Sequence, residues 1–171
     1  VAPNVWVPGS EIRRDEIRSA KPVDLAAILS SRTPSAALTR KGPLAGDVVL
    51  RGFTRDNVVV TVDDNRTYCA CPNRMDPPAF HVSSQQIEAV SVRTGPFSVD
   101  QGGSVGGTIA VRTSAPSDEA FGRLYGYLGS FDYRAAGATG GSPLSGDLTG
   151  LGGLYYQSGG VYEDGSGVPF T

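Results

Sequence analysis

The stretch that decides the fold of this chain is Ile87-Glu88-Ala89-Val90-Ser91-Val92-Arg93-Thr94-Gly95-Pro96. Its section Ala89–Arg93 is rich in β-branched residues and stops at a Gly-Pro pair, which predicts a strand followed by a turn. A glycine-rich segment, Gly102–Gly107, then leads into Thr108–Thr113, which has the composition of another strand. The sequence therefore predicts two strands connected through a glycine-rich turn.

The sequence before these strands predicts a helix and a small sheet. Asp24 precedes three apolar residues that have the i, i+3, i+4 spacing of one helix face, and its carboxylate is suited to cap that helix. The segments Asp47–Phe53 and Asn57–Asp64 are rich in β-branched residues and bounded by turn formers, so we interpret them as strands of one small sheet. Residues 1–20 show no convincing periodicity. Up to Thr113 the pattern is that of an α+β domain.

The composition changes near Pro116. In Phe121–Tyr133 the aromatic residues share one parity, whereas Gly122, Gly126, Ser130 and Asp132 share the other. Such alternation, sustained beyond the roughly 9 to 11 residues of a tilted membrane strand, is typical of an outer-membrane barrel, although a half-buried strand of a soluble sheet also fits it. Leu144–Ser158 alternates partly and is a second candidate. Two strands cannot close a barrel, so barrel strands here would need to pair with protein outside this sequence.

Composition and charge exclude several classes of protein. The 23 glycines and 12 prolines favour a fold rich in turns and strands over a long helical bundle. The 15 basic and 17 acidic residues are scattered and give a formal charge of −2, so no basic surface is available for nucleic acid. No stretch approaches the roughly 20 apolar residues of a membrane-spanning helix.

The order of these motifs resembles the plug of TonB-dependent outer-membrane receptors. The resemblance rests on Leu50–Phe53, on the valine-rich strand that ends at Asp63-Asp64, and on Ile87–Pro96 with the glycine-rich element that follows. It implies an α+β plug domain followed by the first antiparallel strands of a transmembrane β-barrel. The expected parts are an N-terminal lead-in at residues 1–21, the plug at 22–115, and two barrel strands with their loops at 116–171.

The resemblance also implies a location, partners and a role. It places the chain in the bacterial outer membrane, with the remainder of a β-barrel and a TonB-type energy-coupling protein as partners. The implied role is transport, and no nucleophile, base and orienting residue of an enzyme can be identified. Val5-Trp6-Val7 is only a faint TonB-box candidate. Arg51 and Arg93 match family positions where plug arginines meet barrel glutamates, although each arginine is equally suited to cap its own strand.

The loop at residues 68–81 carries the most specific chemistry of the sequence, because it holds both cysteines, the only methionine and the only histidine. Pro72 is suited to begin a single helical turn, which would place Cys71 and Met75 on one side about 6 Å apart. A thiolate and a thioether together favour Cu(I) over hard cations, and the thioether argues against zinc. The structural alternative is that the methionine fills a packing gap and the cysteines are small buried groups.

The remaining residues of this loop leave more than one interpretation open. A disulfide between Cys69 and Cys71 would be strained, because the two residues are separated by only one position. Cys69 and His81 are each either a further metal ligand or a loop residue without that role. A periplasmic redox or metallochaperone module that uses the two cysteines as a dithiol is an alternative from a different class of function.

The run Cys71–Asp76 is similar to the copper-binding plug loop of the OprC and NosA branch of this receptor family. That resemblance implies Cys71 and Met75 as Cu(I) ligands, completed by a histidine and a methionine from the missing part of the barrel. The expected function is therefore uptake of copper. The alternative within transport is a receptor for a siderophore or another chelate, in which the loop is only structural.

Overall fold

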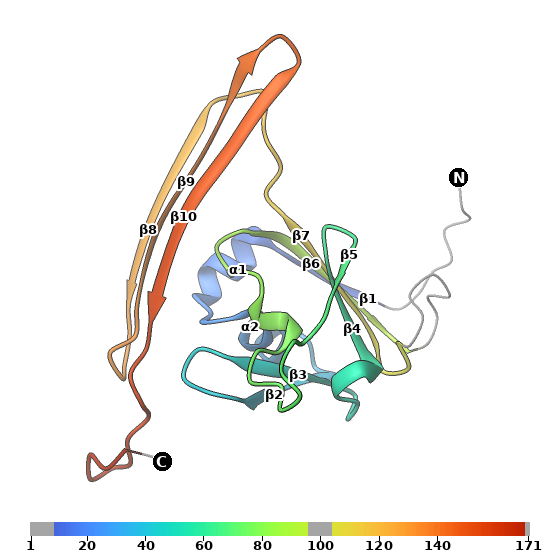
Figure 1. Cartoon of the computed structure of the whole chain (residues 1–171), viewed down its shortest axis with the longest axis vertical. Helices are drawn as coiled ribbons and strands as arrows, with labels where there is room; N and C mark the ends of the chain where they lie inside the picture. The colour runs from blue at the N-terminus through green and yellow to red at the C-terminus, as the bar shows by residue number, and fades with distance from the viewer. Residues whose placement is uncertain (1–8, 96–103, 170–171) are drawn as a thin grey trace. The chain divides into compact units, whose positions relative to one another are not determined.

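The computed structural model describes residues 9–95 and 104–169, which divide into two compact units, Val1–Thr113 and Ser114–Thr171 (Figure 1). The TonB-box candidate Val5-Trp6-Val7, Pro96, and the glycines Gly102 and Gly103 of the predicted turn lie outside the described residues. The sequence placed the change of composition at Pro116. The boundary between the two units lies two residues earlier, after Thr113.

The first unit is built on a five-stranded sheet of order β1-β6-β7-β4-β5. Its strands are β1 (Gly9–Arg13), β4 (Val58–Val62), β5 (Asn65–Thr67), β6 (Ile87–Thr94) and β7 (Gly107–Thr113). Strands β4 and β7 are parallel, and the other neighbours are antiparallel. The two strands predicted from Ile87–Thr113 therefore exist and are paired with each other.

The core lies between one face of this sheet and the helices. Helix α2 (Leu25–Arg32) begins at Asp24, whose Oδ1 accepts a hydrogen bond of 2.7 Å from the Ala27 N–H, as the sequence predicts. Its residues Leu25, Ala26, Ile28 and Leu29 are fully buried in one core with side chains of the sheet such as Val90 and Ile109. Apolar residues recur about every 3.6 positions in the helix and every second position in the strands. They thus form the two apolar faces that pack against each other.

The expected lead-in at residues 1–21 is a structured part of this unit where it is described. Strand β1 pairs with β6, and helix α1 (Arg14–Ala20) follows it directly. The N–H of Arg13 donates to Glu16 at 3.0 Å, which closes the first turn of the helix. Ile12 and Ile17 are buried in the core. Two buried apolar residues among charged ones are too few for a periodic signal, so the sequence pattern did not reveal this strand and helix.

The predicted small sheet of residues 47–53 and 57–64 is wrong in its pairing. Strand β3 (Gly46–Leu50) pairs with β2 (Ala36–Arg40) in a separate two-stranded sheet, while β4 lies in the five-stranded sheet. After β3 the chain reverses, because Arg51 and Gly52 have φ of 53° and 82° and Leu50 bridges to Phe53. This reversal and the short 3₁₀ turn η1 (Arg55–Asn57) separate the two strands.

The second unit is an antiparallel sheet of three strands rather than the predicted two. They are β8 (Phe121–Leu128), β9 (Arg134–Ser145) and β10 (Leu148–Ser158), in the order β10-β9-β8 (Figure 1). The expected strand Phe121–Tyr133 ends earlier, at Leu128, and a turn follows in which Phe131 and Asp132 have positive φ. Strand β9 was missed because its alanines, glycines and proline have low strand propensity.

The two faces of this three-stranded sheet differ in chemistry. One face carries Leu124, Leu128, Leu154 and Tyr156 among glycines and alanines, and Leu124 is 86% and Leu154 81% exposed. The opposite face holds the Tyr125 and Tyr155 rings, 6.3 Å apart between centroids, with the hydroxyl of Tyr155 at 2.6 Å from that of Thr139. The face identified as small or polar from sequence therefore also bears the exposed leucines. Among the described residues, no helix is long and apolar enough to cross a membrane.

Candidate metal-binding loop

The candidate loop leaves β5 at Thr67 and ends in the 3₁₀ turn η2 (Pro78–Phe80). Its central feature is a tight turn, in which the N–H of Arg74 donates to the carbonyl oxygen of Cys71 at 2.9 Å. Pro72 occupies the second position of this turn, where its fixed φ is favourable. Arg74 then takes a φ of 54°, in the left-handed region.

This geometry corrects the predicted helical turn. A helix would continue with right-handed backbone angles through Met75, whereas the left-handed Arg74 directs the chain out of the helical path. The relation of Cys71 to Met75 is therefore that of residues on either side of a tight turn, not of neighbours on a helix face. Met75 is 65% exposed, so the interpretation of this residue as packing filler does not fit the structure.

The carboxylate of Asp76 folds back onto the start of the loop. It accepts hydrogen bonds from the N–H of Ala70 at 3.2 Å, the N–H of Cys71 at 3.1 Å and the thiol of Cys69 at 3.2 Å. These hydrogen bonds hold the pKa of Asp76 below its ordinary value, and the bond from the Cys69 thiol has the largest effect. The sequence does not predict this role of Asp76, because its N–H donors lie five and six residues earlier, beyond the range of ordinary local side-chain to backbone bonds.

The four sequence-predicted ligands occupy different environments. Cys69 and Cys71 are both free and partly exposed, so the strained disulfide does not form. Burial and the bond to Asp76 raise the pKa of the Cys69 thiol, whose single S–H is shared between Asp76 and the carbonyl oxygen of Cys71, 3.1 Å from the sulfur. His81 lies beside Asp76, with 3.8 Å between Nε2 and Oδ2. The described residues contain no group of three or more His, Cys, Asp or Glu side chains that could hold a metal ion.

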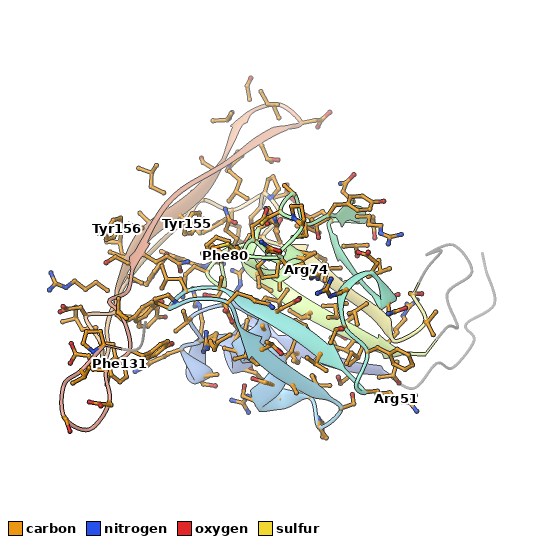
Figure 2. The ribbon with its side chains drawn as sticks, turned by 60° about the horizontal axis from the view of Figure 1, so that its bottom comes forward. Arg51, Arg74, Phe80, Phe131, Tyr155 and Tyr156 are labelled. Atoms are coloured by element: carbon orange, nitrogen blue, oxygen red, sulfur yellow. The ribbon has the colours of Figure 1, made fainter. Side chains whose placement is uncertain are left out.

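Arg74 anchors the loop to the interior of the first unit (Figure 2). Its Nε and Nη2 donate to the two carboxylate oxygens of Asp47 at 2.9 and 3.0 Å, and the two residues are 8% and 7% exposed. Asp56 adds a longer contact of 3.7 Å. The hydrogen bonds to Asp47 hold the pKa of the guanidinium above its ordinary value. No pattern in the sequence connects two positions 27 residues apart, so this pair was not predicted.

The two arginines expected to contact a barrel lie apart from this loop. Arg51 is exposed just after the end of β3, and its N–H donates to the carbonyl oxygen of Ser35 at 2.8 Å (Figure 2). Arg93 is exposed in β6 opposite Thr108. In the described part of the chain neither side chain lies within 4.0 Å of a carboxylate, and their contact with a barrel stays a prediction.

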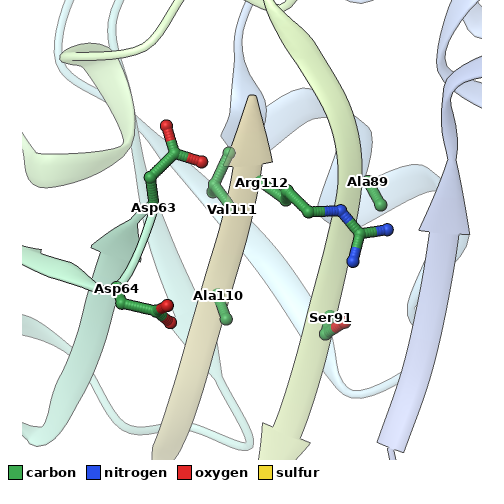
Figure 3. A pocket seen from close by; sticks show the side chains of 7 residues that line it. All are labelled: Asp63, Asp64, Ala89, Ser91, Ala110, Val111 and Arg112. Atoms are coloured by element: carbon green, nitrogen blue, oxygen red, sulfur yellow. The ribbon is translucent and has the colours of Figure 1, made fainter. Parts of the chain in front are cut away.

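A pocket of about 330 Å³ lies on the five-stranded sheet (Figure 3). It is lined by Asp63 and Asp64 of the β4–β5 turn, by Arg112, and by small residues of β6 and β7. Asp63 already accepts hydrogen bonds from the N–H and the hydroxyl of Thr113, at 2.8 and 2.6 Å. Arg112 lies 3.9 Å from Glu11. Asp63 and Arg112 therefore already take part in contacts within the sheet.

Comparison with known proteins identifies a domain family and several solved structures. The family model described as TonB-dependent Receptor Plug Domain matches residues 4–108. The structure described as the copper transporter OprC is similar at a TM-score of 0.74 and 25% identity, over 94% of this chain and 25% of that chain. No match is found among curated proteins.

Two further receptors have similar structures. The siderophore receptor PirA from Acinetobacter baumannii gives a TM-score of 0.71 at 19% identity, over 91% of this chain and 25% of that chain. The ferric yersiniabactin uptake receptor FyuA from Yersinia pestis gives 0.72 at 18% identity, over 95% and 26%. At these identities the likeness shows a shared fold. The chain spans about a quarter of the length of these structures.

Proposed function

The chain belongs to the family of TonB-dependent receptor plug domains, and on this premise we propose that it is the plug portion of an outer-membrane receptor that takes up copper. Plug domains of this family are components of transporters in the bacterial outer membrane. The finer assignment, to copper, rests on one observation: a thiol and a thioether, at Cys71 and Met75, flank a tight turn in a partly exposed loop.

The chemistry of these two side chains favours Cu(I) as the substrate. A thiolate supplies negative charge and a soft sulfur, and a thioether adds a second soft donor without charge, a combination that suits Cu(I) better than zinc or hard cations. The high exposure of Met75 leaves its sulfur accessible to an ion arriving from solvent. Two ligands are too few for tight retention, so we expect the remaining donors to come from the barrel or from Cys69 or His81.

In the proposed transport cycle, external copper binds at Cys71 and Met75 on the outward-facing side of the plug, and the plug then rearranges to release it inward. The remainder of a β-barrel surrounds the plug, and a TonB-type protein supplies the energy. Arg51 and Arg93, both exposed, are the residues we expect to contact barrel carboxylates. The similarity to the copper transporter OprC supports this reading.

The second candidate is a receptor for a ferric siderophore, because PirA and FyuA have similar folds. A siderophore presents a large chelate whose iron is already fully coordinated, so its capture does not require free sulfur ligands on the plug. The two proposals therefore differ in whether the isolated metal binds to this loop.

Copper stoichiometry tests the proposal. After anaerobic loading of the full chain in detergent with Cu(I), we expect Cys71→Ala to abolish binding, because it removes the anionic donor of the pair. Met75→Leu should weaken binding and leave part of it. Cys69→Ala is the comparison, because it removes the other thiol of the loop and its hydrogen bond to Asp76; at saturating Cu(I) it should still bind copper, with a lowered affinity. Unchanged copper content in Cys71→Ala would remove the copper assignment and leave the receptor assignment standing.

A further inference from the structure

The two residues that flank Met75 both direct their side chains back into the protein. Arg74, before it, reaches the buried carboxylate of Asp47 in β3 through two hydrogen bonds. Asp76, after it, accepts the N–H groups of Ala70 and Cys71. Met75 itself is mostly exposed, so its position is set by its neighbours and not by its own packing.

The Arg74–Asp47 pair ties the loop to a rigid element. Its two parallel N–H···O bonds fix the plane of the guanidinium as well as its distance from the carboxylate, which a single contact would not do. Asp47 belongs to β3, whose residues pair with β2 along its full length. Buried ion pairs contribute little net stability because both charges are desolvated, and their best-attested role is to select one geometry. The pair therefore fixes the position of the loop relative to β3.

Hydrogen bonds also fix the backbone of Cys71 at both of its polar groups. Its N–H donates to Asp76, and its carbonyl oxygen accepts from the N–H of Arg74 at 2.9 Å and from the thiol of Cys69 at 3.1 Å. The thiol is then the one polar group of Cys71 that these hydrogen bonds do not involve. Asp76 and the Arg74 backbone thus hold the first sulfur ligand, and the same two residues flank the second.

We propose that Arg74 and Asp76 are positioning residues for the metal, which hold the sulfur atoms of Cys71 and Met75 in a preformed arrangement for one Cu(I). This inference rests on the proposed function. Groups that orient metal ligands without touching the metal set affinity by removing the cost of ordering the ligands. Arg74 does so through Asp47, and Asp76 does so through the backbone of residues 70 and 71. Cys69 has the same kind of role, as a donor to Asp76, and is not a ligand.

The test measures the dissociation constant for Cu(I) in the full chain in detergent, by competition with a Cu(I) chelator under anaerobic conditions. Arg74→Lys keeps the charge and loses the paired hydrogen bonds, and Asp76→Ala removes the acceptor. Loss of orienting groups of this kind typically lowers metal affinity roughly 10- to 100-fold, and we expect this range for both variants. The copper bound at saturation should keep its sulfur coordination in the X-ray absorption spectrum.

Matched controls separate positioning from stability. Arg40→Lys alters another arginine paired with a buried carboxylate, Asp24, at 3.4 Å. Asp63→Ala removes another carboxylate that accepts a backbone N–H in a turn. Both controls should bind copper as the wild type does.

Equal affinity in the wild type, Arg74→Lys and Asp76→Ala would overturn the positioning role and leave the copper assignment intact. An equal loss in the two controls would overturn it as well, because the effect would then be general destabilisation. A wild-type chain that binds no Cu(I) would instead overturn the proposed function, and the inference with it.

Discussion

At the scale of single residues, the sequence predicts what depends on neighbours along the chain and misses what depends on contacts across the fold. Asp24 was identified because its helix begins with the next residue, and its carboxylate does cap that helix. Arg74 and Asp47 are 27 residues apart and meet only once β3 and the loop are folded. The tight turn at Cys71 was interpreted as a helical turn, because Pro72 suits the first positions of both.

Gly107 allows the start of β7 to lie close to the backbone of β6. It starts β7 with a φ of 141°, between Thr94 of β6 and Val58 of β4. A Cβ at this position would collide with the backbone carbonyl oxygen of Arg93, which cannot move without disturbing β6. The glycine is therefore required both by its backbone angle and by the close approach of the neighbouring strand.

We expect Gly107→Ala to lower the free energy of unfolding by about 1–3 kcal/mol, the range for a residue held in an unfavourable backbone conformation. Chemical denaturation of the full chain in detergent measures it. Gly42→Ala is the control, because no atom lies within 4 Å of its added Cβ, and it should change the value by less than about 0.5 kcal/mol. Equal effects of the two substitutions would contradict this account of Gly107.

At the scale of elements, strands with strong propensity could be predicted and strands with weak propensity could not. Ile87–Thr94 and Gly107–Thr113 are rich in β-branched residues and were found within two residues of their true bounds. Strand β9 is mostly glycine, alanine and serine, and only its pairing with β8 and β10 makes it a strand. Its small residues also leave space for neighbouring rings, because a Cβ on Gly137 would lie 2.5 Å from the Tyr125 hydroxyl.

The two faces of this sheet predict opposite responses to charge. As first strands of a transmembrane barrel, they should turn the face of Leu124 and Leu154 toward lipid and the face of Arg123, Thr139 and Gln157 toward the interior. An arginine on the lipid face near the middle of the bilayer costs about 2–4 kcal/mol, whereas one on the interior face does not meet hydrocarbon.

We therefore expect Leu154→Arg to lower the yield of folded, membrane-inserted receptor and its unfolding free energy in lipid bilayers by about 2–4 kcal/mol. Gln157→Arg, in the same strand on the opposite face, is the control and should have little effect. If Gln157→Arg were the damaging substitution, the assignment of the two faces would be reversed.

At the scale of the whole molecule, the order of motifs along the chain was enough to predict the receptor family, and the match to the plug family over residues 4–108 confirms it. The α+β plug followed by antiparallel strands is likewise confirmed by the similarity to receptors of known structure. The substrate is a different matter, because receptors described as binding copper and siderophores share this fold. Our proposal of copper as the substrate therefore rests on side chains of one loop and not on the fold.

The central claim is that this plug binds Cu(I) through Cys71 and Met75, and X-ray absorption at the copper edge of the anaerobically loaded full chain tests it most directly. The account predicts a first shell that contains sulfur in the wild type, a reduced sulfur contribution in Met75→Leu, and no bound copper in Cys71→Ala. A wild-type spectrum with only nitrogen and oxygen neighbours, or one unchanged by Cys71→Ala, would contradict it.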